Sequence, residues 1–277
     1  MALVGFMQGR LSPPVGGRIQ AFPWQHWRIE FSLASRHGFP LIEWTLDHER
    51  LDENPLMTAG GRREIREIAR DLGVQVRSLT GDCFMEAPFY KAEGRERGRR
   101  LDQVERVIEA SAEIGVEYVV MPLVDNGRLE SIRQEEDLRT GFARVAPLLK
   151  RAEIRILFES DFQPGRLRQF LEPSDPSLFG INYDVGNSAA MGFDPTEEIG
   201  AYGDRILNVH VKDRVLGGST VPLGQGHAHF GAVFGALKRI GYLGNYILQT
   251  ARAADGRDVE ILCEYRDAVM RWLREAE

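Results

Sequence analysis

Four side chains in the second half of the chain are of types that bind metal ions, and each lies at the end of a short apolar segment. They are Glu159, Asp184, His210 and Gln249, separated by 25, 26 and 39 residues. Two carboxylates, an imidazole and an amide oxygen form a mainly oxygen ligand set, which suits Mn²⁺, Mg²⁺ or Co²⁺ and also admits Zn²⁺. The pattern predicts one divalent metal ion held by all four side chains.

Each of these residues also has an ordinary structural explanation. A carboxylate at the end of a strand often caps the following helix. His210, taken alone, would suit a hydrogen-bonded histidine of the core. The occurrence of the four at the ends of consecutive segments favours the metal site.

Basic side chains also lie at or just after the ends of short apolar segments. They are Arg10, Lys212, Arg214 and Arg252. Arginine binds phosphate and carboxylate groups through paired N–H donors. Glycines at 217–218 and 224–226 offer backbone N–H groups after the seventh segment, where barrels often hold phosphate. We therefore expect an anion, such as phosphate, on the substrate. The alternative is that these glycines form ordinary turns and that the arginines form ion pairs with aspartates.

The segments that must position these residues are eight short apolar runs of β type. They are rich in Val, Ile and aromatic residues and are apolar on both faces, which favours a parallel sheet covered on both sides. They cover residues 3–7, 41–44, 76–79, 118–123, 154–158, 180–183, 206–211 and 246–248.

Amphipathic helical patterns alternate with these runs, at 62–72, 101–114, 138–149, 230–240 and 261–273. Gly73 and Gly115 follow two of them as stop signals. The mixed-charge run 93–100 fits the solvated start of a helix.

Eight such units in 277 residues predict a (β/α)₈ TIM barrel that occupies residues 1–277 as one domain. The main structural alternative is a doubly wound open sheet. That fold places a glycine-rich turn after its first strand, whereas this chain continues Gly9-Arg10-Leu11-Ser12-Pro13.

Composition excludes several classes of protein. With 43% hydrophobic and 27% charged residues, the chain is neither disordered nor fibrous, and it has no apolar run long enough to cross a bilayer. A net charge of −6 argues against a general nucleic-acid binder. We expect a cytoplasmic protein without a secretory signal, with Cys83 and Cys263 as free thiols.

Two loops rich in aromatic residues, 10–28 and 82–90, are expected near the mouth of the barrel. Exposed aromatic side chains there would either close over a bound sugar or form a contact between subunits. A homo-oligomer is expected only by analogy with other barrels.

The chain resembles the sugar phosphate isomerase/epimerase family with the xylose isomerase-like TIM barrel. The resemblance covers essentially the whole chain. It is carried by the sequences at 184–187 (DVGN), 210–213 (HVKD) and 222–226 (PLGQG), together with 7–11 (MQGRL) and 42–44 (IEW). These motifs are specific for the superfamily but not for a substrate.

The resemblance implies a single divalent metal held by glutamate, aspartate, histidine and glutamate, of which Glu159, Asp184 and His210 match the first three. It also implies proton abstraction next to a carbonyl, with Glu159 as the base and a metal-stabilised enediolate. The substrate would be a sugar or sugar phosphate of carbohydrate metabolism. Glu43 and Asn187 are further substrate-binding candidates, beside the four basic residues.

The chain departs from the family pattern at two positions. Gln249 replaces the second glutamate and cannot exchange a proton at neutral pH, and Asn187 stands where the family often has histidine. Glu159 would then act as a single base in aldose–ketose isomerisation, or His227 or His229 would replace the missing glutamate. We select His229 as the second catalytic candidate.

Three other functions compete with this prediction. A lyase or dehydratase of the same barrel family would use the same residues, and Gln249 favours a sugar-binding barrel without turnover. An abasic-site endonuclease needs several zinc ions and more histidines than the six present here.

Overall fold

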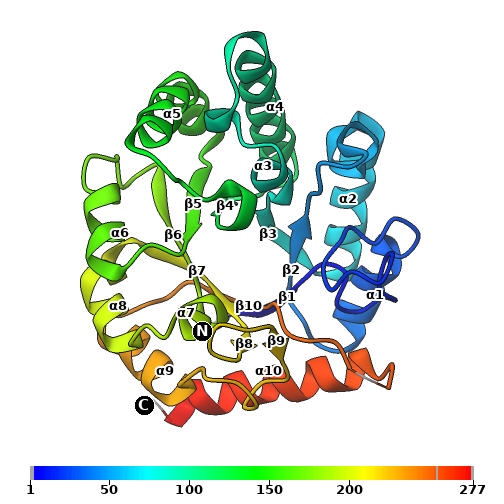
Figure 1. Ribbon diagram of the computed structural model, residues 1–277. Coiled ribbons are helices and arrows are strands. Elements are labelled where there is room, and N and C mark those ends of the chain that lie inside the picture. Colours follow the sequence, from blue (N-terminus) through cyan, green and yellow to red (C-terminus); the bar gives the residue numbers. More distant parts are fainter. Residues whose placement is uncertain (1–2, 254, 276–277) are drawn as a thin grey trace.

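The computed structural model describes residues 3–253 and 255–275. Eight parallel strands form a closed barrel in the order β1-β10-β7-β6-β5-β4-β3-β2, seen end-on in Figure 1. The predicted TIM barrel is confirmed. The barrel strands are β1 (Val4–Met7), β2 (Leu41–Thr45), β3 (Gln75–Thr80), β4 (Tyr118–Leu123), β5 (Arg155–Ser160), β6 (Phe179–Asp184), β7 (Ile206–Val211) and β10 (Asn245–Leu248). Each predicted strand matches one of these to within two residues at either end.

Within the described part of the chain, ten α-helices surround the barrel or lie at its mouth (Figure 1). They are α1 (Trp27–Arg36), α2 (Ala59–Leu72), α3 (Asp82–Glu86), α4 (Gly94–Glu113), α5 (Ile132–Ala152), α6 (Pro164–Leu171), α7 (Val185–Met191), α8 (Pro195–Tyr202), α9 (Phe230–Arg239) and α10 (Asp258–Glu275). Short 3₁₀ helices lie at Leu51–Glu53, Pro55–Met57, Phe89–Lys91, Asp125–Gly127 and Gly203–Arg205.

All five predicted helices are present, and the charged run 93–100 does begin α4. Thr58 caps the start of α2, and Gly73 ends it in the left-handed conformation that glycine adopts without strain. The helices absent from the prediction include α3, α6, α7 and α8, which have five to eight residues each. Segments this short contain too few turns for a clear hydrophobic period.

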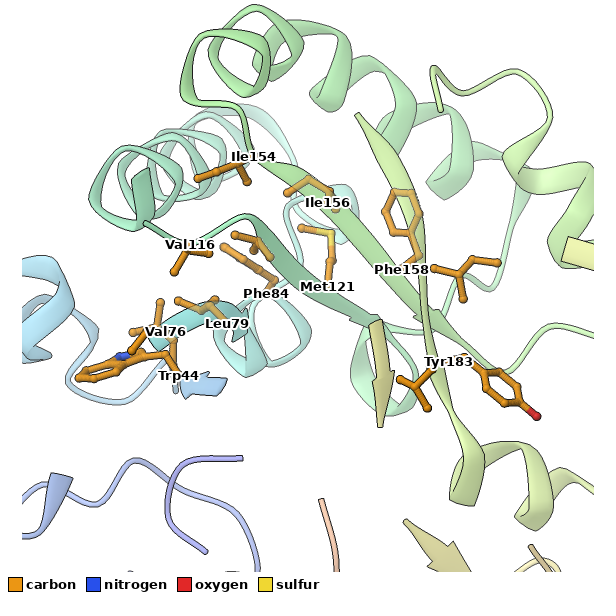
Figure 2. Close-up of a cluster of buried hydrophobic side chains, with 14 of the residues drawn as sticks. Trp44, Val76, Leu79, Phe84, Val116, Met121, Ile154, Ile156, Phe158 and Tyr183 are labelled. Atoms are coloured by element: carbon orange, nitrogen blue, oxygen red, sulfur yellow. The ribbon is translucent and has the colours of Figure 1, made fainter. Parts of the chain in front are cut away.

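The main hydrophobic core includes aromatic side chains from the two loops expected to form lids. Phe22 and Trp27 from the first loop and Phe84, Phe89 and Tyr90 from the second are all buried. Figure 2 shows Phe84 with Trp44 in a cluster of buried apolar side chains. The expectation of exposed aromatics is therefore wrong for these five, because their apolar surface is more stable inside the core than in water.

The inside of the barrel, in contrast, holds several buried polar side chains as well as a small apolar cluster of Met7, Leu41 and Ile247. Glu43 is fully buried there, and its carboxylate accepts hydrogen bonds from Ser78 Oγ and Thr80 Oγ1, each at 2.6 Å, and from Asn208 Nδ2 at 3.0 Å. Such a buried carboxylate is tolerated only when its oxygens are paired.

A second buried carboxylate fixes the loop that follows β1. Glu30 on α1 is fully buried and accepts hydrogen bonds from the backbone N–H groups of Gly9, at 2.8 and 3.0 Å, and Leu11, at 2.9 Å. Burial raises the pKa of Glu30 to about 7. This contact joins the loop to the outer helix.

Both cysteines are free, as predicted, with Cys83 buried and Cys263 partly buried. Over residues 3–253 and 255–275, no helix combines the length and the apolar character needed to cross a membrane.

We expect the substitution Glu30→Ala to lower the free energy of unfolding by about 2–4 kcal/mol, because it leaves two buried N–H donors unpaired. Urea unfolding followed by circular dichroism measures this change. The exposed neighbour Gln25 provides a control, since Gln25→Ala should change stability by less than about 0.5 kcal/mol. Equal stability of the two variants would contradict the role given to Glu30.

Candidate metal centre and substrate cavity

A cavity of about 320 Å³ opens at the carboxyl ends of the barrel strands. One side of it is formed by residues that follow or end β5, β6, β7 and β10, namely Glu159, Asn187, Lys212, Arg214 and Gln249. The other side is formed by Arg18, Ile19 and Gln20 of the loop after β1 and by residues that end or follow β2, β3 and β4. This is the end of the barrel at which TIM-barrel enzymes bind their substrates.

Three of the four predicted metal ligands lie together, and one of them, Glu159, lines this cavity. Candidate ligand atoms of Glu159, Asp184 and His210 all lie within 4.8 Å of one another. His210 Nδ1 is 3.2 Å from Glu159 Oε2 and 3.9 Å from Asp184 Oδ2. Parallel pairing places Asp184 directly beside His210 on the neighbouring strand.

A contact with Glu43 fixes the orientation of the His210 ring. Its Nε2 atom lies 2.6 Å from Glu43 Oε1 at the bottom of the polar interior. Its Nδ1 atom is buried and has no hydrogen-bond partner among the residues that the structure describes. A histidine held by a carboxylate through one nitrogen, with the other nitrogen facing two carboxylates, fits a metal ligand.

The charges of this cluster are strongly coupled. Although burial opposes it, the carboxylates of Glu43 and Glu159 raise the pKa of His210 to about 10. Burial also opposes ionisation of Glu159, but His210 and Lys212 hold the pKa of that carboxyl below its usual value. Burial raises the pKa of Asp184, against the attraction of Lys212. Without metal, a proton on His210 therefore offsets part of the negative charge.

Asp184 has two functions at once. Its Oδ1 accepts a hydrogen bond from the backbone N–H of Asn187 at 2.9 Å and thereby caps α7. Its Oδ2 lies 2.6 Å from Lys212 Nζ. The helix-capping alternative for this aspartate is thus compatible with its place among the candidate ligands.

Gln249 lies at the cavity next to this cluster, and its amide is engaged at both ends. Its Oε1 accepts a hydrogen bond from Lys212 Nζ at 2.8 Å, and its Nε2 donates to Gln20 Oε1 at 2.8 Å. Gln20 in turn donates to Asp82 Oδ2 at 2.6 Å. The ion pair of Asp184 with Lys212 and the three hydrogen bonds that follow therefore link Asp184 to Asp82 along the cavity.

Glu159 is held by two amides. Asn182 Nδ2 donates to its Oε2 at 2.8 Å, and Asn187 Nδ2 donates to its Oε1 at 2.7 Å. Asn187 is oriented by Arg214, whose Nη1 donates to Asn187 Oδ1 at 2.8 Å. These contacts leave Glu159 at the cavity surface with a fixed orientation.

Three other candidates lie elsewhere. Glu43 is enclosed beneath the cavity. Arg10 donates to the carbonyls of Thr250 and Ile19 at 3.0 and 2.7 Å. Arg252 donates to the Gly9 carbonyl and to that of Ser12, the latter at 2.7 Å. The two arginines thus tie the loop after β1 to the segment after β10 and do not line the cavity.

His227 and His229 are also not brought to the cavity. Both side chains are exposed, and His227 Nδ1 accepts a hydrogen bond from the backbone N–H of Leu216 at 3.1 Å. The loop that carries them is bound to Asp213 through the N–H groups of Gly224, Gly226 and Ala228.

Sequence analysis missed Asn182 and Asn208, which support Glu159 and Glu43. Each stands two residues before a candidate ligand, Asp184 or His210. Because side chains alternate along a strand, that spacing puts both pairs on the same face. The spacing of two residues between each asparagine and the candidate ligand was the signal that the sequence offered. Gln20, in the loop after β1, and Asp82, the first residue of α3, carried no such signal.

Comparison with known proteins identifies relatives over most of the chain. The family model described as "Xylose isomerase-like TIM barrel" matches residues 31–276. L-Ribulose-5-phosphate 3-epimerase of Shigella flexneri is 24% identical over 246 residues, which cover 85% of this chain and 86% of that enzyme.

Solved structures share the fold at low identity. A protein described as IOLI with a bound zinc atom has a TM-score of 0.78 and 16% identity, covering 100% of this chain and 99% of that one. An L-ribulose 3-epimerase has a TM-score of 0.75 and 18% identity, with coverage of 100% and 96%. From the match over 31–276, the chain belongs to the xylose isomerase-like TIM-barrel family.

Proposed function

We propose that this protein is a divalent-metal-dependent isomerase or epimerase of a sugar or sugar phosphate. The observation that carries the proposal is the position of Nδ1 of the buried His210, which lies 3.2 Å from Glu159 Oε2 and 3.9 Å from Asp184 Oδ2 beside the cavity. One relative is named L-ribulose-5-phosphate 3-epimerase, and one structural neighbour is described with bound zinc. Both support this assignment.

Glu159, Asp184 and His210 would hold the metal, with the amide oxygen of Gln249 as the fourth ligand. When bound, a divalent ion such as Mn²⁺, Mg²⁺, Co²⁺ or Zn²⁺ supplies Lewis-acid polarisation of a substrate carbonyl. Glu159 is the base that removes the proton from the carbon beside that carbonyl. It suits this function because it is ionised, lies at the cavity surface and is oriented by Asn182 and Asn187.

The identity of the second proton-transfer group distinguishes the two reactions. An epimerase that uses two bases needs a titratable group on the opposite face of the substrate, and Gln249 cannot fill that place. His229 would have to move inward from its exposed position to do so. A single base, Glu159, is sufficient for aldose–ketose isomerisation, in which one proton returns on the same face.

The engagement of Gln249 by Lys212 and Gln20 favours a second candidate, a barrel that binds a sugar without turnover. Exchange of the substrate's carbon-bound hydrogen with solvent separates the two, because only the enzyme catalyses it. Product analysis separates an isomerase from a lyase or dehydratase of the same family.

We expect the purified protein to bind about one divalent ion per chain, and Asp184→Asn to weaken binding on the order of tenfold or more. Because asparagine still caps α7, a loss of metal affinity would show that the carboxylate of Asp184 is a ligand. Asp194→Asn is the matched control, because Asp194 also caps a helix, α8, outside the site. Elemental analysis and calorimetric titration measure both. Equal affinity in the two variants would contradict the proposed ligand set.

The same titration should depend on pH. Since the pKa of His210 is about 10 in the metal-free protein, metal binding must displace a proton from its Nδ1 at neutral pH. We therefore expect the affinity to rise with pH, by about tenfold per unit between about pH 6 and 8. An affinity that is flat over this range would exclude His210 as a ligand.

We expect Glu159→Gln to reduce solvent exchange at the reacting carbon by a factor on the order of 10³ or more, because a general base is removed. The fold should survive, as judged by circular dichroism. Glu197→Gln, an exposed position on α8, controls for the loss of one carboxylate. Undiminished exchange in Glu159→Gln would remove this residue as the base.

A further inference from the structure

The backbone groups expected to bind an anion after β7 are already occupied by the protein's own carboxylate. Asp213 is fully buried, and its Oδ2 accepts hydrogen bonds from the N–H groups of Gly224 and Gly226 at 2.8 and 2.9 Å. Its Oδ1 accepts one from Ala228 N–H at 3.0 Å. Converging N–H groups of this kind form an anion-binding nest, and here the anion is Asp213.

The glycines of this loop serve that internal contact. A Cβ atom at Gly226 would lie 2.2 Å from Asp213 Oδ1, so only glycine lets the backbone approach the carboxylate. The glycine N–H groups of the earlier turn, between β8 (Asp213–Arg214) and β9 (Thr220–Val221), also have hydrogen-bond partners within the protein. Gly217 N–H donates to the Ala190 carbonyl at 2.8 Å, and Gly218 N–H donates to the Val215 carbonyl at 2.9 Å.

The basic side chains that line the cavity have protein partners as well. Arg214 donates through Nε and Nη2 to the Gly218 carbonyl at 3.0 and 2.7 Å, in addition to its bond with Asn187. Lys212 is held between Asp184 and Gln249. Arg18 lies 3.6 Å from the exposed Glu49. A phosphate group would have to compete with each of these contacts.

The half of the cavity opposite the candidate metal centre is acidic. It is lined by Asp47, Asp82, Glu86 and Asp125, which follow β2, β3 and β4. Burial, together with the neighbouring carboxylates of Asp47 and Glu159, raises the pKa of Asp82 to about 7, against a hydrogen bond from Gln20. Burial and the nearby carboxylates disfavour the negative charge on Asp82. The same surroundings disfavour the binding of a phosphate dianion.

Resting on the proposed function, we infer that this site takes an unphosphorylated, uncharged sugar, whose carbonyl end faces Glu159 and whose hydroxyl-bearing chain extends toward Asp47 and Asp82. Carboxylate oxygens accept hydrogen bonds from hydroxyl groups, so the acidic half binds a polyol chain and repels a phosphorylated one. This inference is the alternative to the sequence-based expectation of an anionic substrate.

The test uses the wild-type protein loaded with Mn²⁺ or Zn²⁺ and a panel of ketopentoses and ketohexoses, each paired with its own phosphate ester. Mass spectrometry of sugars recovered from D₂O follows deuterium incorporation, and calorimetry follows binding of the same pairs. We expect kcat/KM for the free sugar to exceed that for its ester on the order of tenfold or more. Millimolar inorganic phosphate should not inhibit.

The outcomes separate the two proposals. Faster exchange with an ester than with its free sugar would overturn the inference and leave the proposed function intact. Exchange with neither compound would reject the proposed function, and the inference would then stand only if free sugars bind more tightly than esters. Absence of binding by every free sugar would overturn it.

A variant pair tests whether the acidic half causes the discrimination. Asp82→Asn keeps an acceptor for Gln20 and, at pH 8 or above, removes one charge, because the pKa of Asp82 is about 7. The preference for the free sugar should then fall severalfold. The matched control is Asp204→Asn, an exposed position on a 3₁₀ helix that precedes β7, which should leave the preference unchanged. A preference unchanged in Asp82→Asn as well would contradict the acidic half as its origin.

Discussion

The arrangement of the site depends on one buried carboxylate. Glu43 is enclosed inside the barrel, and its two oxygens bind side chains from β3 and β7: Ser78, Thr80, Asn208 and His210. An unpaired carboxylate in this position would be strongly destabilising, so these partners are required for the barrel to close around it. By holding Nε2 of His210, Glu43 also determines that Nδ1 points toward Glu159 and Asp184. The same contact therefore stabilises the interior and orients the candidate metal centre.

From Glu43 a path of hydrogen bonds through two asparagines leads to the mouth of the barrel. Asn208 joins Glu43 to Asn182, and Asn182 joins Asn208 to Glu159. Asn187 and Arg214 continue the path to the carbonyl of Gly218 on the β8–β9 turn. An amide side chain carries both donors and an acceptor, so it can satisfy a neighbour on either side. The proposed base is consequently fixed by the interior and by the outer loop together, which keeps its orientation independent of bound substrate.

Sequence patterns predicted the parts of this structure that depend on local order. The apolar runs predicted all eight barrel strands, and the strand ends predicted three side chains that meet. What the patterns could not predict was the direction of a side chain whose partner is distant in the chain. Glu43 and His210 are 167 residues apart, and Arg10 and Thr250 are 240 residues apart. The aromatic loops show the same limit, because their sequence does not reveal whether Phe22 or Phe84 faces solvent or reaches the core.

The replacement of glutamate by glutamine on the segment after β10 follows from the direction of hydrogen bonding across the cavity. The chain of contacts begins at Lys212, whose ammonium only donates, and ends at Asp82, whose Oδ2 accepts a hydrogen bond from Gln20. Gln249 and Gln20 lie between them, and each accepts from the Lys212 side and donates toward Asp82. A glutamate at position 249 would accept from Lys212 but could not donate to Gln20. Gln20 would then have to turn its amide toward the new carboxylate, which would place its own oxygen against the oxygen of Asp82. With an aspartate at position 82, an amide at position 249 is what joins the loop after β1 to the candidate metal centre.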